Sequence, residues 1–105
     1  MNILFDHCVP KRLRRSLAHP VKTTREMGWE RLQNGALLSE AAKQFDVLLT
    51  VDQNIKYQQN VTALPVAVVV LIGMSNKLAD LLPLVPRIEE VLKNLSPCTI
   101  VEVKF

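Results

Sequence analysis

The stretch Asp46-Val47-Leu48-Leu49-Thr50-Val51-Asp52 contains a short apolar run that ends at an aspartate. A run of this length without a polar face is typical of a strand buried on both sides of a parallel sheet. The segment Asn2-Ile3-Leu4-Phe5-Asp6 has the same pattern near the start of the chain. If both are parallel strands, Asp6 and Asp52 emerge together at the carboxyl edge of one sheet, where open α/β folds place their ligands.

The rest of the chain alternates between strand-like and helix-like segments. Three further strands are expected, over residues 20–24, 66–72 and 99–105, the last as a half-exposed edge strand. Three helices are expected, starting at Pro10, starting at Asn34 and running over 78–95. Pro83 and Pro86 should kink or break the third helix. This alternation predicts an α/β fold with three layers and a mainly parallel central sheet, as one domain over residues 1–105.

Composition narrows the class of protein. The 105 residues are 49% apolar and 22% charged, an ordinary globular balance, and the net charge of +3 permits a polyanionic partner without demanding one. The longest apolar run, Val66–Ile72, is too short to span a bilayer, and Met1–Phe5 is too short for a secretory leader. Cys8 and Cys98 lack metal-binding or redox spacing, so we expect two reduced, largely buried thiols in a soluble cytoplasmic protein.

The paired aspartates indicate metal chemistry. Carboxylates in a partly dry crevice need a compensating charge, and Mg²⁺ or Mn²⁺ prefers such oxygen ligands. A bound ion of this kind can orient a phosphodiester and activate a water. The alternative is structural, because an aspartate at a strand end often caps a helix or forms an Asx turn. For Asp6 or Asp52 alone the structural role is favoured, whereas the matched pair favours function.

Other polar residues are weaker candidates. The basic cluster over residues 11–15 follows Asp6 and could contact a phosphate backbone or simply be a solvated helix face. The amide-rich segment after Asp52 could bind RNA, with Tyr57 stacking on an unpaired base, or could be an ordinary polar loop. From the residues alone, Glu26 is best interpreted as a solvated glutamate on a surface turn. His7, beside Asp6, lacks a partner at zinc-ligand spacing.

Several short motifs, taken in order, resemble a small PIN-like family that was long catalogued as a domain of unknown function. This family is related to the PIN-domain ribonuclease toxins. The motifs are Asn2-Ile3-Leu4-Phe5-Asp6-His7-Cys8-Val9-Pro10, Arg25-Glu26-Met27-Gly28-Trp29, Asn34-Gly35, Leu48-Leu49-Thr50-Val51-Asp52-Gln53-Asn54 and Tyr57-Gln58-Gln59-Asn60. Together they span nearly the whole chain.

The resemblance implies a reduced PIN-like α/β/α fold and a magnesium- or manganese-dependent endoribonuclease site. Matched by position, Asp6, Glu26 and Asp52 are the retained acids. Many relatives carry aspartate where this chain has Asn34 and Asn54. An asparagine oxygen can ligate a cation but brings no charge, so three acids suit one ion better than two.

We therefore expect a PIN-like ribonuclease, a phosphodiester hydrolase that acts on RNA as the toxin of a toxin–antitoxin pair. Asp6 and Asp52 would hold one Mg²⁺ or Mn²⁺, with Glu26 as third ligand or as base for the attacking water. The expected substrate-binding residues are Asn34, Asn54, Arg12, Arg15, Lys56 and Tyr57. The resemblance implies a small DNA-binding antitoxin as protein partner, and a homodimer is left open. The alternative is a non-catalytic PIN-like module that binds RNA or a partner protein through a degenerate acidic cleft.

Overall fold

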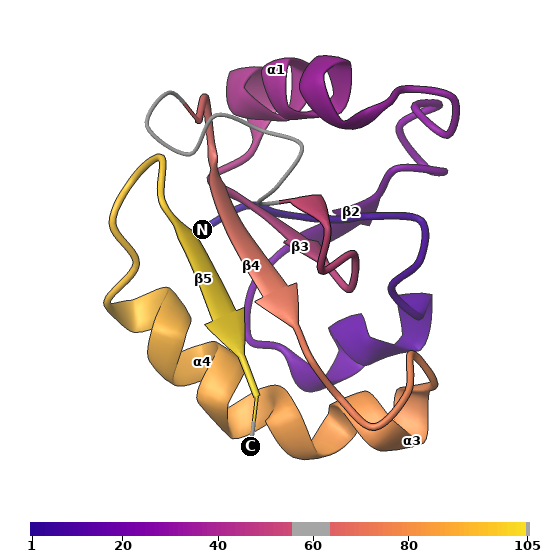
Figure 1. Ribbon diagram of the computed structural model, residues 1–105, viewed down its shortest axis with the longest axis vertical. Helices are drawn as coiled ribbons and strands as arrows, with labels where there is room; N and C mark the ends of the chain where they lie inside the picture. The colour runs from indigo at the N-terminus through magenta and orange to yellow at the C-terminus, as the bar shows by residue number, and fades with distance from the viewer. Residues whose placement is uncertain (56–63, 105) are drawn as a thin grey trace.

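The computed structural model describes residues 1–55 and 64–104 and contains a five-stranded sheet in which every neighbouring pair is parallel. The strands are β1 (Ile3–Phe5), β2 (Val21–Thr23), β3 (Val47–Thr50), β4 (Ala67–Leu71) and β5 (Ile100–Val103), in the spatial order β2-β1-β3-β4-β5 (Figure 1). The predicted α/β fold with a mainly parallel sheet is confirmed. β5 lies at an edge of the sheet, as its alternating sequence predicts.

The strands bury side chains on both faces of the sheet, which explains why β1, β3 and β4 read as continuous apolar runs. Ile3 and Phe5 belong to one core cluster, together with side chains of the two 3₁₀ segments and of the C-terminal helices. Leu4 belongs to a second cluster, together with Leu37 and Ala41 of the helix Asn34–Gln44. Alternate residues of a strand point to opposite faces, so a strand covered on both sides has no solvent-exposed position.

Helical segments connect the strands. They are η1 (Lys11–Ser16), α1 (Asn34–Gln44), α3 (Leu78–Leu81), η3 (Leu82–Leu84) and α4 (Val85–Lys93). Figure 1 shows α1 on one side of the sheet and α3 and α4 on the other, in agreement with the two core clusters. No helix within the described residues is long and apolar enough to cross a membrane.

Two of these segments show how proline shapes the fold. The helix expected from Pro10 is a six-residue 3₁₀ helix with Pro10 at its N-cap, and the buried side chains of Leu13 and Leu17 hold it against the core. The expected break near Pro83 and Pro86 is a 3₁₀ turn between two α-helices. Proline lacks the backbone N–H that a continuous helix needs, so the chain tightens there and then resumes an α-helix with Pro86 in its first turn.

Candidate functional site

The strand order creates a crevice between β1 and β3. After β1 the chain turns into η1, whose Leu13 joins the first core cluster. After β3 it turns to the opposite face, where Ile55 joins the second cluster. The two connections diverge from neighbouring strands, and open α/β sheets bind ligands at such a point, outside the carboxyl ends of the strands. The register aligns Phe5 with Leu49, so the residues that follow both strands lie at this crevice.

Asp6 lies at the crevice and is 5% exposed. Its backbone N–H donates to the carbonyl of Leu49 at 2.9 Å, which continues the ladder between β1 and β3. Its Oδ1 accepts a hydrogen bond from the backbone N–H of His7 at 2.8 Å and lies 3.0 Å from Nδ1 of the same histidine. Its Oδ2 accepts from the hydroxyl of Thr50 at 2.8 Å. The buried charge is therefore stabilised by three polar contacts, as a carboxylate with so little access to water requires.

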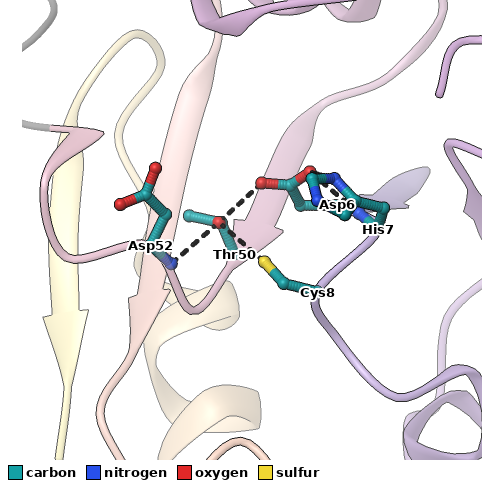
Figure 2. Close-up of polar contacts among 5 residues, drawn as sticks. All are labelled: Asp6, His7, Cys8, Thr50 and Asp52. Carbon is teal, nitrogen blue, oxygen red and sulfur yellow. Dashed lines mark hydrogen bonds and ion pairs between the residues drawn. The ribbon is translucent and has the colours of Figure 1, made fainter. Parts of the chain in front are cut away.

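Thr50, the last residue of β3, connects the two aspartates. It is fully buried, and its hydroxyl donates to Asp6 and accepts from the backbone N–H of Asp52 at 3.1 Å. Figure 2 shows Thr50 between them, with the Asp52 carboxylate on the far side and directed away from Asp6. Cys8 Sγ lies 3.7 Å from the same hydroxyl. In the sequence Thr50 is indistinguishable from an ordinary strand residue, and only the structure reveals its contacts with both aspartates.

Asp52 is half-buried, and its carboxylate has fewer polar contacts with described residues than that of Asp6. Its Oδ1 accepts from the backbone N–H of Asn54 at 2.9 Å, which is the Asx turn that the structural alternative predicts for this residue. No described residue donates a hydrogen bond to its Oδ2. One oxygen of Asp52 therefore has a local structural role, and the other accepts no hydrogen bond from residues 1–55 or 64–104.

Both aspartates line one pocket of ≈ 320 Å³, which we call the β1–β3 pocket. Its lining residues are Asp6, His7, Cys8, Leu32, Leu37, Val51, Asp52 and Asn76. Asn76 comes from the loop after β4 and was not selected from the sequence. The sequence feature that points to Asn76 is its position just beyond the third apolar strand. The carboxyl end of that strand lies at the same edge of the sheet.

Glu26 lies outside this pocket, in the turn that follows β2. Its Oε1 accepts from Arg14 Nη1 at 2.8 Å and from the backbone N–H of Thr23 at 3.0 Å, and its Oε2 lies 3.6 Å from Lys11 Nζ. The Thr23 hydroxyl accepts in turn from the Glu26 backbone N–H. The Thr23 N–H, followed by Arg14, lowers the pKa of Glu26 to about 2. Glu26 is thus ionised and engaged by two cations at a position that joins η1 to the end of β2.

The remaining predicted residues are dispersed. Arg12 and Arg15 are exposed on η1 and line neither the β1–β3 pocket nor the turn around Glu26. Asn54 contacts Asp52 through its backbone, and Asn34 begins α1. The two other candidates, Lys56 and Tyr57, lie outside the described residues.

The two cysteines differ in their surroundings. Both are free thiols, with Cys8 half-buried in the β1–β3 pocket and Cys98 exposed in the loop before β5. Burial, with a contribution from the charge of Asp6, raises the pKa of the Cys8 thiol. The expectation that both thiols are largely buried is wrong for Cys98, which follows Pro97 in a turn with a positive φ of 58°.

The donor set of the β1–β3 pocket suits one hard cation. Magnesium sites that bind phosphates commonly use one or two carboxylates and keep several waters, and Asp6 with Asp52 provides two carboxylates. Within residues 1–55 and 64–104 no three histidine, cysteine, aspartate or glutamate side chains form a group that could hold a metal. The two carboxylates of the pocket do not face each other, since that of Asp52 is directed away from Asp6 (Figure 2).

Comparisons with protein-family models, curated proteins and solved structures found no match to this chain. The PIN-like assignment accordingly stays a prediction from the motifs.

Proposed function

We propose that this chain is a metal-dependent endoribonuclease of the PIN-like type, with its active site in the β1–β3 pocket. The observation that carries the proposal is that Asp6 and Asp52 line a single pocket where the connections from β1 and β3 diverge. Such a crevice is the usual ligand site of an open parallel sheet, and paired carboxylates there suit a phosphodiester substrate with a hard cation. A small DNA-binding antitoxin would be the protein partner.

The residues of the pocket would have distinct roles. Asp52 would offer its Oδ2 to Mg²⁺ or Mn²⁺, and Asp6 would contribute negative charge from a position fixed by Thr50. The bound ion would supply activation of a water and stabilisation of the leaving oxygen. Asn76 would donate a side-chain hydrogen bond to the phosphate or sugar, since this residue lines the same pocket.

In this proposal Glu26 is a positioning residue. Its contacts with Arg14, Lys11 and the Thr23 backbone hold η1 against the turn after β2. An acid that is already engaged by two cations is a poor third ligand, because metal binding would first have to displace them. This role departs from the one that the family resemblance implies for Glu26.

A second candidate function is a non-catalytic PIN-like module that binds RNA or a partner protein. It is favoured by the state of Asp6, which is almost inaccessible and already has donors at both oxygens. A site with one accessible carboxylate would bind a metal weakly and could serve recognition alone.

Cleavage of a fluorescent single-stranded RNA in manganese, magnesium or chelator separates the two candidates. Asp52→Asn is the informative variant, because Asp52 is half-exposed and its loss leaves the core intact. Asp46→Asn is the matched control, the same change at an exposed aspartate before β3, at the opposite edge of the sheet. The proposal expects metal-dependent cleavage that Asp52→Asn abolishes and Asp46→Asn preserves. Absence of cleavage by the folded wild-type protein would favour the binding module.

A further inference from the structure

A second pocket opens on the other side of Asp6, between the segments that follow β1 and β2. Its volume is ≈ 340 Å³, and we call it the β1–β2 pocket. Its lining residues are Asp6, His7, Val9, Pro10, Lys11, Thr23, Arg25 and Glu30. Asp6 and His7 line both pockets, so the two hollows meet at this pair of residues. The His7 side chain is 71% exposed and stands at the junction.

The β1–β2 pocket contains the cations that the β1–β3 pocket lacks. Lys11 approaches from η1 and Arg25 from the turn after β2, so the two cations come from separate segments of the chain. Lys11 Nζ is 3.6 Å from Glu26 and its side chain is 61% exposed, which is a weak surface pair that a phosphate can replace. Arg25 forms no ion pair with any described residue. Arg14, by contrast, is bound to Glu26 at 2.8 Å and is not available to a ligand.

Two acids also line the β1–β2 pocket, and they act differently. Asp6 is buried, and the Thr50 hydroxyl and the His7 backbone N–H donate to its carboxylate. Glu30 is exposed and should oppose an anion bound beside it. The same pocket therefore offers residues whose neutralisation should change anion affinity in opposite directions.

The geometry points to the β1–β2 pocket as a phosphate subsite for single-stranded RNA, occupied by a phosphate that flanks the one in the β1–β3 pocket. The RNA strand would cross the carboxyl edge of the sheet over Asp6 and His7. Lys11 and Arg25 would contact the flanking phosphate, and Thr23 at the end of β2 also lines the pocket. This inference rests on the proposed function in taking RNA as the ligand, but it concerns binding and needs no cleavage.

Binding of a fluorescent single-stranded RNA, measured by anisotropy in chelator over a range of salt concentrations, tests the subsite. Arg25→Ala and Lys11→Ala should each weaken binding and lower the magnitude of the slope of log K against log salt by about 0.7, the contribution of one phosphate contact on a single strand. Glu30→Gln should tighten binding. Arg87→Ala is the matched control, since Arg87 is exposed on α4 and lines neither pocket.

The inference is overturned if Arg25→Ala and Lys11→Ala bind with the wild-type affinity and salt slope, or if Arg87→Ala loses as much as either. Circular dichroism of each variant excludes a folding defect as the cause. Cleavage is scored separately from binding. If binding depends on Arg25 and Lys11 but no RNA is cleaved, the result supports the phosphate subsite and contradicts the nuclease proposal. If the Arg25 and Lys11 variants bind and cleave RNA as the wild type does, the result contradicts the subsite and supports the nuclease proposal.

Discussion

Replacing Thr50 with valine tests whether its buried hydroxyl holds the site together. Valine has nearly the same shape, so Thr50→Val removes hydrogen bonds without opening a cavity. The lost bond to Asp6 Oδ2, at 2.8 Å, is charge-assisted, and such bonds contribute about 1.5–3 kcal/mol. The Asp52 N–H loses its acceptor as well, but Asp52 is half-buried and water can replace part of that bond. We expect a loss of about 2–3 kcal/mol in the free energy of unfolding.

Thr24→Val is the matched control, with the opposite expectation. Thr24 is 1% exposed just after β2, and its hydroxyl oxygen has no hydrogen-bond partner among the described residues. Burying an unpaired polar group costs about 1–3 kcal/mol, so a methyl group in its place should leave stability unchanged or raise it.

Urea unfolding followed by the fluorescence of Trp29, the single tryptophan, measures both variants. Trp29 packs edge-on against Phe45 with ring centroids 6.0 Å apart, so its emission reports on the core beneath α1. A loss below about 0.5 kcal/mol in Thr50→Val, the range of an ordinary surface substitution, would show that the Thr50 hydroxyl does not hold the site together. Equal losses in the Thr50 and Thr24 variants would show the same.

Three further predictions follow from local contacts. The pKa of Glu26 is lowered from 4.5 to about 2, so its contribution to stability is present above pH 4.5 and is lost as pH falls toward 2. Glu26→Gln should therefore flatten the pH dependence of the urea midpoint between these two values. Gly73→Ala should destabilise by about 1–3 kcal/mol in thermal unfolding, because a Cβ would lie 2.9 Å from the carbonyl oxygen of Asp80; a wild-type melting temperature would contradict this. A thiol reagent should modify exposed Cys98 well before Cys8, whose pKa is raised by burial, and mass spectrometry of the peptides would reveal the reverse order.

The centre of the sheet could be predicted from sequence because β1, β3 and β4 have no polar face. The runs that became β1, β3 and β4 are bounded by aspartate or proline, and burial on both sides leaves only one interpretation of such runs. The observed strands β3 and β4 are shorter by one or two residues than their apolar runs, because a run can continue beyond the end of its strand. Val51 shows this, because it is buried but lies beyond β3.

Only part of the candidate site could be predicted from the sequence. Contacts that follow from the pairing of parallel strands could be predicted, and contacts between irregular segments could not. Asp6 and Asp52 could be paired because parallel strands bring their carboxyl ends together. The partners of Glu26 could not be found this way, since Arg14 precedes it by twelve residues on a 3₁₀ segment with weak periodicity. Thr50 was missed because threonine is common in strands, and nothing in the sequence distinguishes a hydroxyl that bridges two aspartates from one that merely fits the sheet.

The proposed metal site uses Asp52, beside the charge of Asp6, and not Glu26, and a manganese-dependent thermal shift can distinguish these residues. At ten times the dissociation constant a bound ion stabilises the fold by about 1.4 kcal/mol, a rise of roughly 5 to 10 °C in melting temperature for a domain of this size. We expect this rise in the wild-type protein and in Glu26→Gln, and we expect Asp52→Asn to lose it. A rise that survives in Asp52→Asn, or that disappears in Glu26→Gln, would contradict the proposed site.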